Sequence, residues 1–232
     1  MICPTTSLCS IGKGERSMGN VPETKNVSPL WRVFINLILI VALSSGTAAF
    51  VGGRYFWNEQ DFKRINKEIA YYQKLTEAEP TEPEHRVNLG YTFLRKGDYE
   101  RALVQLDAAR EFDENYMPAY LNAGYVYQAM ELWDEALEQF QKVTELAPDD
   151  YRGFFNMGVC FTSLGKYEDA LDMYFTAKLL RPGASDVAFY TAMTYEKMGS
   201  VEAAIEEYQE ALTFNPKYTE AQLAIERLTK AQ

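Results

Sequence analysis

The side chains that most often carry catalysis or bind metals are few in this sequence. The one histidine, His85, has no cysteine or carboxylate pair at ligand spacing, and alone it cannot supply a multi-histidine metal site. Three cysteines, Cys3, Cys9 and Cys160, cannot make a disulfide framework. Cys160 directly precedes Phe161 in an apolar stretch and is expected to be a small buried hydrophobe.

The remaining polar motifs do not assemble into a reaction centre either. No Ser, His and Asp set can be formed around a histidine that lacks a candidate partner. The acidic pairs Glu206-Glu207 and Asp149-Asp150 are expected on solvated faces or at helix caps, and Gly12–Ser17 lacks the spacing of a phosphate-binding loop. The sequence therefore predicts no catalytic residue, no metal, no cofactor and no enzyme activity.

The charge of the chain is unevenly distributed. The chain has 232 residues, of which 47% are hydrophobic and 14% aromatic, so it can bury a sizeable core. Residues 1–57 carry a net charge of +3, whereas residues 80–232 carry −12. Such an acidic part repels phosphate backbones and anionic lipid headgroups, so nucleic acid is excluded as its partner.

An uncharged run between Val33 and Val51 predicts a transmembrane helix over residues 33–53. Arg32 and Arg54 bracket this run, and tryptophan and tyrosine side chains lie at its ends. A membrane-spanning helix needs roughly 20 apolar residues, and aromatic residues are typical of both interfaces. We expect an uncleaved, single-pass anchor in the cell membrane. A buried core helix is the less favoured alternative.

A cleaved signal peptide is the second alternative for this segment. Lys25 and Arg32 would form its basic part, and residues 44–49 are small enough for a cleavage site, but Phe50 and Val51 extend the apolar run past that site. The flanking basic residues favour a cytoplasmic C-terminal part. The signal-like order favours an extracytoplasmic one, which is the expectation adopted here.

Residues 1–29 read as a polar tail. Within it, Lys13-Gly14-Glu15 can be encoded by a purine-rich bacterial ribosome-binding site shortly before Met18. We expect that Met18 is the true start of a bacterial protein. The alternative is a disordered tail that begins at residue 1.

A period of 34 residues runs through the acidic part of the chain. It aligns Gly90 with Gly124, Gly158 and Ala192, and it aligns an aromatic residue three positions later in each unit. Each unit reads as two helices joined by a short turn. Gly158 and Ala170 are expected to face each other so that the two helices of one unit approach closely. One such hairpin cannot bury its apolar face alone, but stacked neighbours can.

These residues resemble the tetratricopeptide repeat, with Leu89-Gly90, Ala123-Gly124 and Met157-Gly158 each followed by an aromatic residue, a later alanine and a second large residue. The resemblance predicts an all-α fold in which a transmembrane helix precedes a solenoid of antiparallel helix pairs. Glu131 departs from the pattern because it replaces the turn glycine of the second unit. Four units are predicted: 83–116, 117–150, 151–184 and 185–218.

The flanks of the array also show helical patterns. Tyr218, Ala221, Ile225 and Leu228 predict a C-terminal capping helix over residues 218–231. Residues 58–79 predict an amphipathic linker or capping helix. A short coiled coil that dimerises the anchor is the less favoured reading of this stretch.

The resemblance implies that the first helix of every unit lines a concave groove that binds a protein or peptide. Asparagines recur there at period 34, and an amide can both donate to and accept from an extended peptide. A basic clamp for a C-terminal carboxylate is largely missing, because Val87 and Tyr91 occupy two of its positions. The predicted groove residues are Val87, Asn88, Tyr91, Leu121, Asn122, Tyr125, Arg152, Phe155, Asn156, Val159, Phe189 and Met193.

The predicted function is therefore that of a membrane-anchored adaptor or assembly factor, bound to a protein or peptide segment. Apolar and aromatic side chains that point away from a stack indicate a recognition surface. The alternative for several of these residues, Phe155 and Phe189 above all, is that they pack between adjacent units. The alternative function is that of a structural subunit packed permanently into a larger membrane complex.

Overall fold

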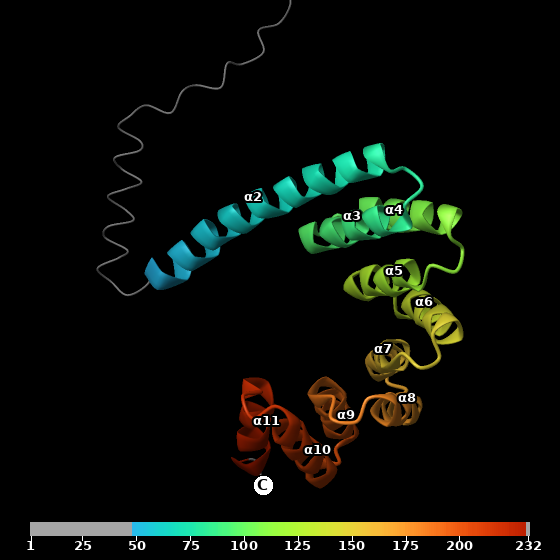
Figure 1. Cartoon of the computed structure of the whole chain (residues 1–232). Helices are drawn as coiled ribbons and strands as arrows, with labels where there is room; N and C mark the ends of the chain where they lie inside the picture. The colour runs from blue at the N-terminus through green and yellow to red at the C-terminus, as the bar shows by residue number, and fades with distance from the viewer. Residues whose placement is uncertain (1–47, 231–232) are drawn as a thin grey trace, which may run out of the picture. The chain divides into compact units, whose positions relative to one another are not determined.

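Every regular element in the described part of the chain is an α-helix (Figure 1). The computed structural model describes the backbone of residues 48–230 and the side chains of residues 61–230. The helices are α2 Ala48–Ala78, α3 Pro83–Lys96, α4 Tyr99–Phe112, α5 Met117–Ala129, α6 Trp133–Leu146, α7 Tyr151–Ser163, α8 Tyr167–Leu180, α9 Ser185–Met198, α10 Val201–Phe214 and α11 Thr219–Lys230.

Helices that follow one another in the chain also pack against one another. The pairs α3/α4, α5/α6, α7/α8 and α9/α10 form hairpins, and the second helix of each hairpin packs on the first helix of the next. Among the first helices, α3 also touches α5, and α7 touches α9. The described part of the chain is thus an α-helical repeat solenoid, as the sequence predicts.

The N-terminal predictions fall mostly outside the described residues. The polar tail 1–29, with Met18, and residues 33–47 of the predicted membrane segment are not described. Residues 48–53 form the start of α2, which continues without interruption through the predicted helix 58–79 to Ala78. Within residues 48–230, the structure contains no helix that combines the length and apolar character needed to span a bilayer.

The chain divides into the units Met1–Asn58 and Glu59–Gln232, and the second contains the helix pairs α3 to α10. In this second unit the apolar stripe of α2 lies against the first hairpin. Ile69 is buried in one cluster with Leu89 and Phe93. The Arg95 side chain donates to the Glu68 carboxylate, and Lys96 donates to the amide oxygen of Asn66. Of the apolar residues on this side of α2, Ile69 is therefore buried and Ile65 and Tyr72 are partly buried against the first hairpin, whereas Phe62 is 51% exposed.

The turn inside each hairpin requires one residue with left-handed backbone. Gly97, Gly165 and Gly199 occupy this place with φ of 75° to 81°, and a Cβ atom there would meet nothing within 4 Å. In the second unit the residue is Glu131, with φ 60°. A residue with a Cβ atom incurs a steric penalty in this conformation, which glycine does not. The second unit therefore keeps the geometry of the turn, but Glu131 adopts this left-handed conformation at a higher energy than a glycine would.

The two helices of each hairpin meet at a small residue, which in the first three units is a glycine that faces a large side chain. A Cβ atom on Gly158 would lie 2.5 Å from the Tyr174 ring, and one on Gly90 would lie 2.9 Å from Leu106. Tyr174 and Leu106 are both fully buried. The Tyr174 ring thus fills the space beside Gly158, and the two helices approach closely as predicted. In the first unit, the backbone oxygen of Ala102, which corresponds to Ala170, lies 3.2 Å from the position of a Cβ atom on Gly90.

Replacing Glu131 by glycine should stabilise the protein. Relief of left-handed strain is worth about 1–2 kcal/mol, and the added backbone entropy of glycine offsets about 0.5–1 kcal/mol of it. We expect a net gain of about 0.5–1 kcal/mol in the free energy of unfolding, measured by urea denaturation. Glu131→Ala keeps the strain and should give no gain, whereas Gly165→Ala should lose about 1 kcal/mol. Equal stability of Glu131→Gly and Glu131→Ala would contradict this account.

Replacing Gly158 by alanine should destabilise the protein. Helix propensity alone favours alanine by about 1 kcal/mol, but the new methyl group would overlap the Tyr174 ring. Overpacking of this kind typically costs about 1–3 kcal/mol. Urea denaturation would measure the loss, with Ser163→Ala on the exposed side of the same helix as a control expected to change little. A stabilised Gly158→Ala variant would show that propensity, not packing, decides at this position.

Candidate functional site

The predicted groove residues lie on the first helices of the four hairpins, α3, α5, α7 and α9. Their surroundings differ widely. Tyr91 is the most open of them, with 46% of its surface exposed, and the Arg95 guanidinium lies 6.0 Å from the centre of its ring. Val159 and Met193 are half-buried. These predicted residues therefore range from exposed to half-buried and do not form a uniform apolar lining.

Two predicted residues are not on the surface. Val87 belongs to the cluster around Leu106, and Leu121 belongs to the one around Phe140; both are buried. The expectation that these side chains point away from the stack is wrong, because in both units this position packs into the core of the array. Their contribution to binding would be indirect.

The asparagines are engaged within the chain. The Asn122 amide donates to the Pro118 carbonyl, with 2.8 Å between nitrogen and oxygen. The Asn156 amide donates to the Arg152 carbonyl at 2.7 Å and to the Tyr125 hydroxyl at 3.4 Å, and this side chain is buried. The expectation of an open ladder therefore needs correction at Asn156. Asn88 stays half-buried, and its backbone carbonyl accepts from the Thr92 hydroxyl.

Tyr125 has a packing role as well as a position on this face. Its ring meets the Phe140 ring edge-on, with 5.8 Å between centres. Burial raises the pKa of the Tyr125 hydroxyl, although the hydrogen bond from Asn156 acts in the opposite direction. Phenol ionisation at neutral pH is therefore disfavoured, and the hydroxyl remains a neutral hydrogen-bonding group.

Phe155 and Phe189 lie at the contacts between units. Phe155 meets Tyr190 of the next unit edge-on at 5.3 Å between ring centres and lies 6.1 Å from Tyr174. Phe189 stacks on Tyr218 at 4.7 Å with an angle of 21° between the rings. Aromatic pairs at such separations are stabilising beyond their buried area. Both phenylalanines therefore hold neighbouring units together, which was the alternative reading of these residues.

The Arg152 side chain is held by Asp150, which also caps α7 through the Arg152 backbone amide. Two guanidinium nitrogens of Arg152 donate to the Asp150 carboxylate. These hydrogen bonds keep the pKa of Asp150 below its usual value. A carboxylate from a partner would have to compete with Asp150 for this arginine.

Cys160 is fully buried, as the sequence predicts. Burial raises the pKa of its thiol to about 11, so the reactive thiolate is scarce at neutral pH. The Gln128 amide points to the Cys160 sulfur at 3.4 Å. Within residues 61–230, no group of three His, Cys, Asp or Glu side chains could hold a metal ion. The described side chains thus form no apparent reaction centre.

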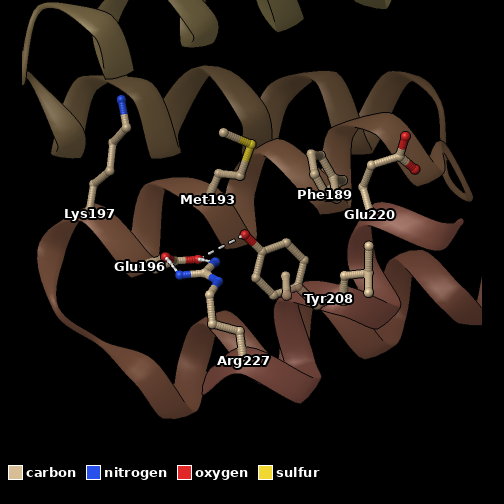
Figure 2. A pocket seen from close by; sticks show the side chains of 9 residues that line it. Phe189, Met193, Glu196, Lys197, Tyr208, Glu220 and Arg227 are labelled. Carbon is tan, nitrogen blue, oxygen red and sulfur yellow. Dashed lines mark hydrogen bonds and ion pairs between the residues drawn. The ribbon is translucent and has the colours of Figure 1, made fainter. Parts of the chain in front are cut away.

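A pocket of about 450 Å³ opens at the C-terminal end of this face, between α9 and α11 (Figure 2). It contains two of the predicted residues, Phe189 and Met193. Tyr208 of α10 closes it from behind, and its hydroxyl donates to the Glu196 carboxylate at 3.1 Å. The residues around the pocket are Phe189, Met193, Glu196, Lys197, Tyr208, Glu220, Leu223, Ala224 and Arg227.

The α11 side of this pocket was absent from the predicted site. Leu223 lies 34 residues after Phe189, and Arg227 lies 34 residues after Met193, so α11 continues the pattern of a first helix. Extending the period into the capping helix would have found them. Leu223 is 59% exposed, which makes it the most exposed residue at this position of the 34-residue period. The residues at this position in the four units are Val87, Leu121, Phe155 and Phe189.

An exposed apolar pair on the outer side of the third unit was also missed. Phe175 and Leu179 of α8 are 62% and 65% exposed. The other three units have only polar residues at the two corresponding positions. Those residues are Asp107, Gln141 and Gln209 at the first position and Glu111, Glu145 and Thr213 at the second. A search for positions at which one unit differs from the other three, and not only for positions at which all four agree, would have revealed this pair.

Comparison with known families supports the repeat assignment. A family model described as anaphase-promoting complex, cyclosome, subunit 3 matches residues 47–143. Models described as tetratricopeptide repeat match residues 121–178 and 192–218. No curated protein sequence matches the chain.

Several solved structures share the fold. The thermophilic tetratricopeptide protein TTC0263 from Thermus thermophilus has a TM-score of 0.62 at 18% identity, covering 76% of this chain and 96% of that one. A structure of MamA has a TM-score of 0.58 at 20% identity, covering 70% and 95%. MamA from Desulfovibrio magneticus RS-1 has a TM-score of 0.59 at 18% identity, covering 81% and 96%. The family models and these likenesses in fold support placing the chain in the tetratricopeptide repeat family.

The contact between α9 and α11 should weaken in acid. Arg227 donates to both oxygens of the Glu196 carboxylate, at 2.7 and 2.9 Å. The hydrogen bonds from Arg227, followed by the one from Tyr208, lower the pKa of Glu196 in the folded chain. Stability from this carboxylate is therefore present above its unfolded pKa of about 4.3 and is lost as the pH falls through the lower folded value.

Melting temperatures of the protein and of Glu196→Gln between pH 7 and pH 3 would test this. We expect the protein to be more stable than the variant at pH 7 and the two curves to converge in acid. Glu226→Gln, which changes an exposed carboxylate of α11, is the matched control and should show a smaller difference. A difference for Glu196→Gln that is the same at pH 7 and pH 3 would assign the effect to packing instead.

Proposed function

We propose that the chain is a non-enzymatic, membrane-anchored adaptor or assembly factor. Its tetratricopeptide array holds a peptide or a segment of a partner protein on the face made by α3, α5, α7, α9 and α11. Tetratricopeptide arrays are protein-interaction scaffolds, and the described residues offer shape and apolar surface but no apparent reaction centre. The acidic charge of residues 80–232 makes nucleic acid an unsuitable ligand.

The observation that carries this proposal is the open pocket on the first-helix face. Apolar side chains that remain exposed in a folded protein often mark a recognition surface. Here Leu223 and Met193 lie at a concave opening, and Glu196 behind them is fixed by Arg227 and Tyr208. A preformed opening of this kind binds a partner with little loss of its own conformational freedom.

The anchor is the second part of the proposal. Residues 33–53 would hold the array close to the bilayer as a single transmembrane helix, as the uncharged run and its flanking residues indicate. The array would lie on the extracytoplasmic side, in keeping with the signal-like order of basic, apolar and small residues. An adaptor tethered in this way meets membrane partners at a high effective concentration.

One observation favours the alternative function, a structural subunit of a larger membrane complex. Phe175 and Leu179 are exposed apolar residues where the other units are polar. A permanent neighbour that covers α8 would remove this surface from water. The two functions therefore use different faces of the same array, and variants of each face distinguish them.

Variants of the two faces should separate the adaptor from the subunit. The partner would first be identified by crosslinking of the tagged full chain in native membranes and mass spectrometry. Tyr91→Ala removes the most exposed aromatic residue of the first-helix face, and we expect partner affinity to fall by roughly 30-fold, the effect of about 2 kcal/mol. The outer-face variant Phe175→Gln with Leu179→Glu copies the residues of the second unit and should retain the partner.

Melting temperatures of both variants control for unfolding. Loss of the partner from the outer-face variant alone, with both variants folded, would sink the adaptor and favour the structural subunit. Loss from Tyr91→Ala alone supports the adaptor.

Deletion of residues 33–53 should release the chain from membranes. The full chain is expected to stay in the membrane fraction after an alkaline carbonate wash, because a helix of this length is inserted and not merely adsorbed. The deletion variant should move to the supernatant. A shorter, released form of the undeleted chain would instead indicate a cleaved signal peptide. Protection of residues 59–232 from protease added to cells whose outer layers have been removed, with the cytoplasmic membrane intact, would contradict the extracytoplasmic orientation.

A further inference from the structure

The two ends of the pocket between α9 and α11 carry opposite charge. Glu220, in the first turn of α11, lies at one end of the opening, and Lys197, near the end of α9, lies at the other (Figure 2). Both side chains are exposed. Neither makes a hydrogen bond or an ion pair with another residue of the described chain, so both charges are available to a ligand.

A second pair of charges at the opening is already matched within the chain, although the Arg227 side chain is 60% exposed. Arg227 binds the Glu196 carboxylate with two hydrogen bonds, and the Tyr208 hydroxyl donates to the same carboxylate. Because this group is internally satisfied, a ligand has nothing to gain by breaking it. The electrostatic character of the opening is therefore set by Glu220 and Lys197.

The middle of the opening is apolar. Phe189, Met193 and Leu223 line it, and Figure 2 shows the first two between the labelled Lys197 and Glu220. The Phe189 ring stacks on Tyr218 and lies 5.4 Å from the centre of the Tyr208 ring, and these contacts favour its present position at the side of the opening. An apolar side chain that enters here would cover Leu223, which is otherwise largely in water.

From this arrangement we propose that the pocket binds an extended segment of a partner protein in which a large apolar side chain is flanked by a basic residue on one side and an acidic residue on the other. The basic residue pairs with Glu220, and the acidic residue pairs with Lys197. The inference rests on the proposed function, because it names the kind of segment that the first-helix face receives. It adds a requirement on the bound segment, namely which charge lies on each side of its apolar residue, that the proposed function does not specify.

Three capped pentapeptides would serve as probes: Lys-Gly-Leu-Gly-Glu, Lys-Gly-Leu-Gly-Lys and Glu-Gly-Leu-Gly-Glu. Each would be titrated into the full chain in lipid nanodiscs, with methyl groups of Met193 and Leu223 observed by NMR. We expect the mixed peptide to bind roughly threefold more tightly than either like-charged peptide, which is the effect of one exposed ion pair, and the preference should fade at high salt. Equal affinity for all three would overturn the charge rule.

Charge-reversal variants make the test independent of peptide hydrophobicity. Glu220→Lys makes both ends positive and should shift the preference to the doubly acidic peptide. Lys197→Glu makes both ends negative and should shift it to the doubly basic one. Glu138→Lys makes the same change as Glu220→Lys at a position of α6 outside the pocket and should leave the preference for the mixed peptide unchanged. A shift in the Glu138 variant as large as in the Glu220 variant would show that net charge, not the pocket, selects the peptide.

A variant of the apolar centre tests the location. Leu223→Ser changes a largely exposed side chain, so the fold should persist, and peptide binding should weaken at least as much as after loss of the ion pair. Unchanged binding would place the peptides elsewhere. Failure of this inference is distinguishable from failure of the proposed function. If the pocket variants keep the native partner while Tyr91→Ala loses it, the adaptor stands and the pocket is not its contact.

Discussion

The close approach of the two helices in each hairpin is the constraint on which the rest of the array depends. Gly158 leaves no room for a methyl group, because the Tyr174 ring occupies the space that a Cβ atom would need. The ring in turn lies against Phe155 on the same first helix, and Phe155 reaches Tyr190 of the next unit. The absence of a side chain at Gly158 thus makes room for the Tyr174 ring. This ring supports Phe155, which contacts the next unit through Tyr190.

The identity of this inserted ring also determines which polar contacts the array can make. In the third and fourth units the ring is a tyrosine, and its hydroxyl meets a polar side chain twelve residues earlier, Thr162 or Glu196. In the second unit the ring is Phe140, which has no hydroxyl, and Gln128 at the corresponding position turns to Cys160 instead. Among the described side chains, every buried polar atom has a hydrogen-bond partner. The ion pair at the C-terminal pocket follows the same pattern, because the Tyr208 hydroxyl donates to the Glu196 carboxylate that Arg227 binds.

The sequence was a good guide to the fold and a weaker one to the surface. A period of 34 residues predicts the helix pairs because backbone geometry and small-residue packing repeat at the same positions. It does not predict exposure, because the neighbouring unit decides whether a given position is covered. Leu121 and Leu223 occupy the same position of the 34-residue period, yet the first is buried and the second is largely exposed. The left-handed Glu131 shows the same limit, since the turn is retained by its neighbours even where the residue type opposes it.

The end of the array is where one repeated pattern acquires a different physical meaning. Inside the array, Leu121 is covered by the cluster around Phe140, so an apolar residue there stabilises the fold. α11 is placed as a first helix, and Leu223 at the same position remains largely in water. The apolar contact that stabilises the inner units is then available to another chain. Within the described residues, the same position of the period therefore supplies core packing in α5 and an exposed apolar side chain in α11, without any residue type special to binding.

Charge follows the same logic as apolar surface at this end of the array. Asp186 and Glu220 occupy the same position of the period, 34 residues apart. The Asp186 carboxylate accepts a hydrogen bond from the Tyr151 hydroxyl of the preceding unit, at 3.4 Å. The residue that corresponds to Tyr151 one unit later is Ser185, whose short side chain cannot reach as far as a tyrosine hydroxyl does. The carboxylate that an inner unit uses for its own cohesion thus stays at the rim of the pocket in α11, where it can select the charge of a ligand.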